Sequence, residues 1–262
     1  MKRIAVAPIG ALALLGLLTG AKGEAHAQDR SGALESRHRK FESPQNFAFE
    51  FRFSPYHPDI DGDPKLGGQR PYQDIFGTMS RLMISAELDW QAVRIPHFGT
   101  IGPGISAGYT SMGAPAPLLH PIAGQSPFSA ENTGIDIFPF YLVAVARADV
   151  VSRELNIPLV PYAKAGLGYA LWRAYNDGGT SSQRGTGVTG KGHTYGTQVA
   201  FGIALHLNVF DSYSARNLDN TMGVNNTYLF WEYYSADLTS FGSTTALRVG
   251  NTSWAAGLAF EF

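Results

Sequence analysis

Residues 46–54 of the chain read NFAFEFRFS, and this stretch decides the class of fold. Phenylalanine occupies every second position, and the positions between hold Ala48, Glu50, Arg52 and Ser54. A period of two places the phenylalanines on one face of a β-strand and the remaining side chains on the other, which no helix does. The sequence therefore predicts a strand with one fully apolar face.

The same alternation recurs along the chain and predicts eight strands in all. Each has about the 9–11 residues of a tilted membrane-spanning strand, or somewhat more. The predicted strands are residues 46–54, 80–90, 101–109, 136–150, 161–172, 197–209, 227–238 and 253–262. An even number of antiparallel strands returns both ends of the sheet to one side of a membrane.

The composition fits an all-β chain with little surface charge. Hydrophobic residues make up 44% of the sequence and charged residues 16%, below the roughly 25% that is usual for soluble domains. There are 30 glycines and no cysteines, so no disulfide framework or lipid-modified cysteine is expected. The net charge of −1 argues against nucleic acid as a partner.

The N-terminus has the three parts of a secretory signal. Lys2 and Arg3 precede an apolar run, and Ala25-His26-Ala27 provides a small-residue cleavage site. The alternative, an N-terminal membrane helix, is disfavoured because the run is shorter than the ~20 residues needed to span. We therefore predict a cleaved signal peptide at 1–27, a disordered periplasmic lead at 28–45 and a barrel at 46–262.

The last strand, SWAAGLAFEF, ends on an aromatic residue. Its apolar face carries Trp254, Ala256, Leu258, Phe260 and Phe262. A soluble barrel such as a lipocalin shows the same alternation with its apolar face turned inward. Three features favour a membrane barrel: this aromatic end, aromatic residues near the strand ends, and the scarcity of charge on both faces.

The predicted connections support an up-and-down order of strands. Those at about 55–78, 110–134, 173–194 and 238–252 are long, as outer loops usually are, and two of the others are short. The connection after residue 209 breaks this rule. For that segment we predict a short amphipathic helix on the periplasmic side.

Four stretches resemble a family of small outer-membrane β-barrel proteins from myxobacteria-like Gram-negative bacteria. They are FEFRFSPYHPDID (49–61), VPYAKAGLGYALW (160–172), SARNLDN with GVNNTYLFWEYYSADL (214–220 and 223–238), and WAAGLAFEF (254–262). The resemblance covers essentially the whole mature chain. It implies the fold and a place in the cell outer membrane. It also implies that the barrel-assembly machinery recognises the last strand through Trp254, Leu258, Phe260 and Phe262. It carries over no catalytic residues.

Eight charged residues take the inward face in the predicted strands: Glu50, Arg52, Arg81, Glu87, Asp89, Lys164, Glu232 and Glu261. Because strands 1 and 8 must pair to close the barrel, we expect Arg52 to reach Glu232 or Glu261, and Arg52 or Arg81 to meet Glu87. Buried charges need such partners to offset their desolvation. In a lumen of eight strands a salt-bridged plug is favoured over a gated ion path.

Metal and catalytic motifs are weak. Asp59, Asp61 and Asp63 alternate in DIDGDP, but glycine and proline stand at the wrong positions for an EF-hand, so a solvated turn is favoured over a divalent site. Gly185 to Lys191 matches a phosphate-loop spacing without the required Ser or Thr. Neither His193 nor His206 has a matching Ser and acid on adjacent strands, so we expect no enzyme and no cofactor.

These observations predict an all-β, eight-stranded antiparallel transmembrane barrel with a plugged lumen and a structural or surface-interaction role. Outer-membrane lipid is its expected partner, and the sequence leaves its oligomeric state open. Two alternatives stay open: a narrow pore for ions or small solutes, and a soluble barrel that binds an apolar ligand.

Overall fold

The computed structural model describes residues 46–118, 124, 126–182, 187–243 and 245–262, and the predicted signal peptide (1–27) and lead (28–45) lie outside them. Eight long strands build the fold. They are β1 (Phe47–Tyr56), β2 (Arg81–Trp90), β4 (Gly99–Pro117), β5 (Phe128–Arg147), β6 (Leu159–Asn176), β8 (Lys191–His206), β9 (Asn226–Asp237) and β10 (Asn251–Glu261).

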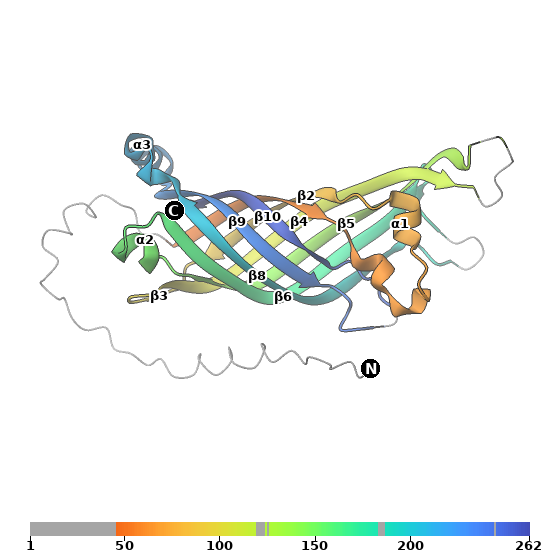
Figure 1. Cartoon of the computed structure of the whole chain (residues 1–262), viewed down its shortest axis with the longest axis horizontal. Coiled ribbons are helices and arrows are strands. Elements are labelled where there is room, and N and C mark those ends of the chain that lie inside the picture. The colour runs from red at the N-terminus through yellow and green to blue at the C-terminus, as the bar shows by residue number, and fades with distance from the viewer. Residues whose placement is uncertain (1–45, 119–123, 125, 183–186, 244) are drawn as a thin grey trace, which may run out of the picture. The chain divides into compact units, whose positions relative to one another are not determined.

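These strands form one closed ring. Each pairs antiparallel with its neighbour in the order β1, β2, β4, β5, β6, β8, β9, β10, and β10 returns to β1 (Figure 1). Two short strands, β3 (Val93–Ile95) and β7 (Gly179–Thr180), add to β4 and β6. The predicted fold class, a closed eight-stranded antiparallel barrel, is confirmed.

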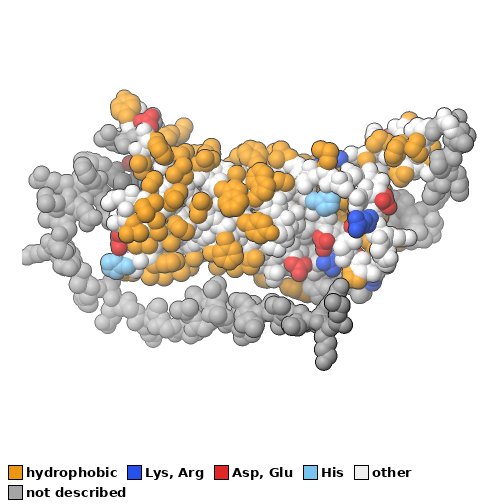
Figure 2. Space-filling model, in the orientation of Figure 1, with side chains coloured by type: hydrophobic (Ala, Val, Ile, Leu, Met, Phe, Trp, Pro, Cys, Tyr) orange, Lys and Arg blue, Asp and Glu red, His pale blue; other side chains and the backbone are white. Residues whose placement is uncertain are grey.

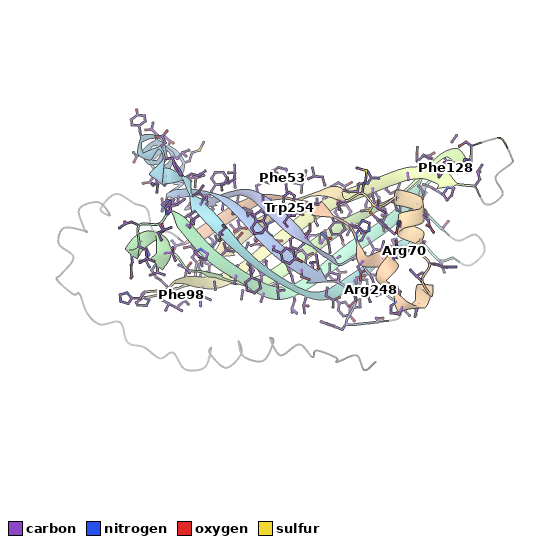
Figure 3. All side chains as sticks on the ribbon, viewed as in Figure 1. Phe53, Arg70, Phe98, Phe128, Arg248 and Trp254 are labelled. Atoms are coloured by element: carbon purple, nitrogen blue, oxygen red, sulfur yellow. The ribbon has the colours of Figure 1, made fainter. Side chains whose placement is uncertain are left out.

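The alternation of the sequence becomes an outward and an inward face. Phe47, Phe49, Phe51 and Phe53 are each about 40% exposed, whereas Glu50 and Arg52 between them are buried. Figure 2 shows hydrophobic side chains covering the barrel wall, with Lys and Arg gathered toward one end and Asp and Glu at both ends. Figure 3 marks Phe53 and Trp254 on this wall.

The two ends of the barrel differ. At the terminal end, where β1 begins and β10 ends, lie α2 (Val150–Glu154), η7 (Leu207–Val209) and α3 (Ser212–Met222). At the loop end lie η5 (Asp59–Gly62), η6 (Pro64–Leu66) and α1 (Pro71–Phe76), with Arg70 and Arg248 close by (Figure 3). Among the described residues, no helix combines the length and the apolar character needed to cross a membrane.

The strands extend further than the sequence predicted. Most of the loop expected at 110–134 belongs to β4 and β5, which pair as far as Pro117 and Phe128 and project beyond the barrel (Figure 1). Residues 110–117 contain glycine, proline and serine, which are poor strand formers, so their composition conceals this pairing. The helix expected after residue 209 is α3, and the strand before it ends at His206 rather than 209.

Apolar clusters fill the lumen on both sides of a charged layer. The larger cluster, toward the loop end, includes Tyr56, Met83, Met112, Tyr234 and Leu238, and Tyr72 of α1 packs into it. The smaller one, toward the terminal end, contains Val160, Tyr162, Ala204, Tyr228, Phe230 and Ala259. The charged layer between them is the candidate site.

Candidate functional site

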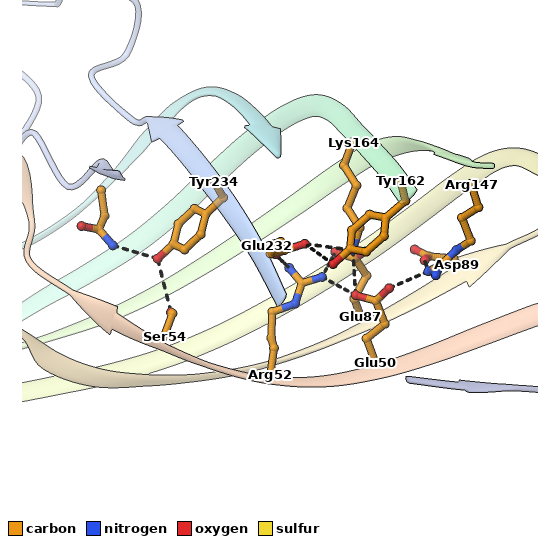
Figure 4. A network of polar contacts seen from close by, with 11 residues as sticks. Glu50, Arg52, Ser54, Glu87, Asp89, Arg147, Tyr162, Lys164, Glu232 and Tyr234 are labelled. Carbon is orange, nitrogen blue, oxygen red and sulfur yellow. Dashed lines mark hydrogen bonds and ion pairs between the residues drawn. The ribbon is translucent and has the colours of Figure 1, made fainter. Parts of the chain in front are cut away.

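Strand register brings seven charged side chains into one buried layer, the lumen network. Glu50 and Glu87 lie directly opposite each other on β1 and β2. Lys164 comes from β6, which stands across the ring from β1. The full lumen network is Glu50, Arg52, Glu87, Asp89, Arg147, Lys164 and Glu232, and each is less than 5% exposed (Figure 4).

Lys164 connects opposite sides of the barrel through ion pairs. Its Nζ lies 2.6 Å from a carboxylate oxygen of Glu50, 2.5 Å from one of Glu87 and 3.6 Å from one of Glu232. Like charges that face each other across two strands repel. The ammonium group therefore offsets the repulsion between Glu50 and Glu87, because it stands between them.

Arg52 makes the second set of ion pairs from the β1 side. Its guanidinium nitrogens lie 2.6 Å from Glu50, 3.0 Å from Glu87 and 3.3 Å from Glu232. Glu232 also accepts a hydrogen bond of 3.1 Å from the Tyr162 hydroxyl. The guanidinium lies over the Phe230 ring, 5.9 Å from its centroid, so the network joins directly to the smaller apolar cluster.

Arg147 is a member of the lumen network that the sequence analysis missed. Its Nη2 lies 2.5 Å from Glu50 and 2.5 Å from Asp89. The strand that carries it, IFPFYLVAVAR, is apolar on both faces, so alternation did not tell inside from outside. The signal that could have found it is its parity with Val143 and Val145, which the structure buries on the lumen face.

Two predicted members lie elsewhere. Arg81, at the loop end of β2, donates to the backbone oxygen of Phe76 and has no contact with Glu87. Glu261, at the terminal end, accepts hydrogen bonds from Gln91, Asn226 and Tyr228 at 2.8–3.1 Å and does not meet Arg52. Both residues occupy inward-facing positions on their strands, but they lie near the two ends of the barrel, whereas the lumen network lies between those ends.

Apolar side chains occupy the lumen on both sides of this layer. Beside the network, a cavity of about 20 Å³ is lined by polar groups that include Ser54, Gln198 and Tyr234, which is about the space that one water molecule needs. At the loop end, Tyr72 donates from its hydroxyl to Met112 Sδ at 3.1 Å, and its ring packs on His57 and Phe76. Burial raises the pKa of the Tyr72 phenol above its ordinary value.

The carboxylates of the lumen network are engaged by protein cations. Within the described part of the chain, Glu50, Glu87 and Asp89 are the one group whose ligand atoms converge as a metal site requires. Lys164, Arg147 and Arg52 supply positive charge to these oxygens. The arrangement is therefore a layer of ion pairs across the lumen, in which three cations offset most of the charge of four carboxylates.

The aspartates of DIDGDP serve separate structural purposes. Asp59 pairs with Arg248 at 2.7 Å, and Asp63 accepts a hydrogen bond from the Lys65 backbone at 3.0 Å. Asp61 accepts from the backbone N–H groups of Tyr72 and Gln73 at 2.8 and 2.9 Å, and so caps the first turn of α1. Each carboxylate has its own protein partner, which favours the interpretation as turn and capping residues.

Replacing Asp61 with Ala is expected to loosen α1 without unfolding the barrel. The loss of a capping acceptor costs about 1 kcal/mol, and α1 is the element that holds Tyr72 over the lumen. Amide hydrogen exchange at residues 71–76 should speed up about fivefold, while the thermal transition of the barrel is unchanged. Asp63→Ala is the control, and equal exchange in both variants would remove Asp61 from this role.

Comparison with known proteins finds fold-level likeness only. No family model and no curated protein matches the chain. Its structure is similar to three crystal structures. The first is the attachment invasion locus protein Ail of Yersinia pestis, in complex with the heparin analogue sucrose octasulfate. The second and third are the N-terminal barrel domain of OprF and the outer membrane protein OprG, both of Pseudomonas aeruginosa. The identities are 10, 10 and 11% and the TM-scores 0.38, 0.39 and 0.45, over 84% of this chain and 99, 100 and 97% of those chains.

At this level of similarity nothing about ligand or activity transfers to the present chain. The closed barrel is established by its own strand pairing, from β1 round to β10.

Proposed function

We propose that the protein is an integral outer-membrane barrel with a sealed lumen, and that it acts as a structural or surface-interaction protein through its loop end. We also propose that it belongs to the family of small outer-membrane barrels that its sequence resembles, that its signal peptide is cleaved after Ala27, and that its role is not enzymatic.

The single observation that carries the membrane proposal is the outward face of the closed ring. Leu82, Ile105, Leu142, Leu167 and Phe201 point away from the lumen and are 57–66% exposed. Such an apolar belt around a monomer far exceeds the patches that soluble proteins leave uncovered. In hydrocarbon the belt is solvated, and a closed ring leaves no strand edge unsatisfied. A soluble barrel that binds an apolar ligand would instead turn its apolar side chains toward the lumen and its polar side chains outward.

The sealed lumen supports a role other than transport. The lumen network spans the ring from β1 to β6, and apolar clusters fill the space on both sides of it. We infer that the narrow-pore alternative is the weaker one.

The last strand supports assembly by the barrel machinery. Trp254, Leu258 and Phe262 are exposed on the outward face. Phe262 exchanges two backbone hydrogen bonds with Phe47, 2.9 and 3.0 Å long, and their rings stack 6.2 Å apart. The terminal residue therefore contributes to closing the ring, and we propose that its aromatic face is also what the assembly machinery binds.

Membrane placement is tested by cell fractionation followed by gels of heated and unheated samples. We expect the protein in the outer-membrane fraction, with a mobility that changes only on boiling, because a closed barrel resists SDS. A soluble periplasmic protein without this change would contradict the proposal and lead to ligand extraction instead.

The sealed lumen is tested by planar-bilayer recording of the purified protein. We expect no steady single-channel steps, because the lumen network and Tyr72 leave no continuous aqueous path. Reproducible steps from the wild-type protein would favour the pore.

A further inference from the structure

A groove on the outward wall lies next to a cluster of cations. Outward side chains form rows that follow the strand register across β2, β4, β5 and β6. In one row Ala86 and Ala107 lie opposite each other, and Phe140 and Tyr169 follow them. The neighbouring row toward the terminal end holds the bulkier Leu88, Ile105, Leu142 and Leu167. The two alanines therefore leave a trough in an otherwise bulky wall.

The trough is large enough for an acyl chain. Its volume is about 530 Å³, and it is bordered by Phe49, Ile105, Phe140, Leu142, Leu167 and Tyr169. Ile105, Leu142 and Leu167 are 60, 57 and 59% exposed, so the trough opens away from the lumen. An apolar trough on a surface of this kind is filled by hydrocarbon rather than by water.

Two rows further toward the loop end, the outward face becomes cationic. Arg173 of β6 lies directly opposite Lys191 of β8, and Leu171 lies opposite His193. Tyr169, which borders the trough, stacks on the His193 ring at 5.7 Å. Arg173 is four residues from Tyr169 along β6, which is about 13 Å. The cations thus lie where a lipid phosphate sits when its chain fills the trough.

The charge of this cluster is not balanced within the described residues. Asp136 accepts hydrogen bonds from Arg173 at 2.6 Å, from Ser111 at 2.8 Å and, at 3.4 Å, from Tyr109. It is buried, whereas the Arg173 side chain remains 54% exposed. Lys191 is also exposed and, in the described part of the chain, forms no ion pair with an acidic side chain. Two like charges directly opposite each other repel unless an anion lies between them.

The geometry points to a binding site for an anionic, phosphate-bearing lipid of the outer leaflet, with one acyl chain in the Ala86–Ala107 trough and its phosphate on Arg173, Lys191 and His193. This inference rests on the proposed function, since it requires the apolar wall to face a membrane. Tyr169, at the border of the trough, and Tyr109, which follows Ala107 toward the loop end of β4, have the amphipathic character of residues at a membrane interface.

The test is native mass spectrometry of the full chain in detergent, titrated with phosphatidylglycerol and, separately, with phosphatidylcholine. We expect tighter binding of phosphatidylglycerol. Lys191→Gln should weaken it about fivefold, since a basic residue near an anionic lipid contributes about that factor. Ala107→Leu, which fills the trough, should weaken the binding of both lipids. Arg70→Gln, at α1, is the matched control and should change neither.

Equal affinity for the two lipids, or equal losses in Lys191→Gln and Arg70→Gln, would overturn the lipid site. Retention of heat-modifiable mobility by each variant shows that the barrel is folded, so such a result would leave the proposed function intact. A wild-type protein that never enters a membrane fraction would overturn both.

Discussion

Replacing Lys164 with Met is expected to lower the free energy of unfolding by about 3–5 kcal/mol, because it removes one of the two cations that Glu50 and Glu87 share and leaves an excess of buried negative charge. Glu50 and Glu87 face each other across β1 and β2, and both lie within 2.6 Å of the Lys164 ammonium. Methionine keeps a similar length and apolar stem, so lost packing contributes little. Urea titration of the protein in detergent, followed by gel mobility, measures the change.

Two further variants separate charge from packing. Adding Glu87→Gln to Lys164→Met removes one carboxylate along with the cation, and should restore part of the loss, since the two sites are in contact. Arg153→Met breaks a solvent-exposed pair with Asp149, 2.9 Å long, and should cost less than about 1 kcal/mol. If Lys164→Met costs no more than Arg153→Met, the lumen network does not hold the barrel together.

The sequence predicted which residues face the lumen better than it predicted their height, that is, their position along the barrel axis. Parity along a strand separates inside from outside, and Glu50, Arg52, Glu87, Lys164 and Glu232 lie inside as expected. Height depends on how neighbouring strands are staggered, and alternation carries no information about stagger. For that reason Arg81 and Glu261 were assigned to the same group, although the register places them near opposite ends.

The sequence also did not predict where the strands end. The distal halves of β4 and β5 pair because each supplies backbone partners for the other, although Pro115, Pro117 and the two glycines of this region give no strand signal. Arg147 was missed for the opposite reason, because its strand is apolar on both faces and parity had no contrast to use. Local composition thus failed where tertiary pairing or burial decides the conformation.

Replacing Gly257 with Val is expected to prevent closure of the barrel. Gly257 lies on β10 opposite Arg52 of β1. A Cβ atom there would lie 1.9 Å from the backbone oxygen of Phe51 and 2.9 Å from the Cα of Arg52. Both are atoms of the neighbouring strand's backbone, so no side chain can move aside to relieve the contact. The β1–β10 seam must separate, which also displaces Arg52 from the lumen network.

The measurement is the folded fraction after refolding into detergent, read as the heat-modifiable band. Overpacking costs about 1–3 kcal/mol or more, and an open seam adds two unpaired strand edges that favour aggregation. We therefore expect at least a tenfold loss of the folded band relative to aggregate. Ala256→Val, at the preceding position, is the matched control. The Ala256 side chain lies on the outward face with Trp254 and Leu258, where the two added carbon atoms meet hydrocarbon. A normal folded fraction for Gly257→Val would mean that the β1–β10 seam can shift its register, and that closure does not depend on this close approach.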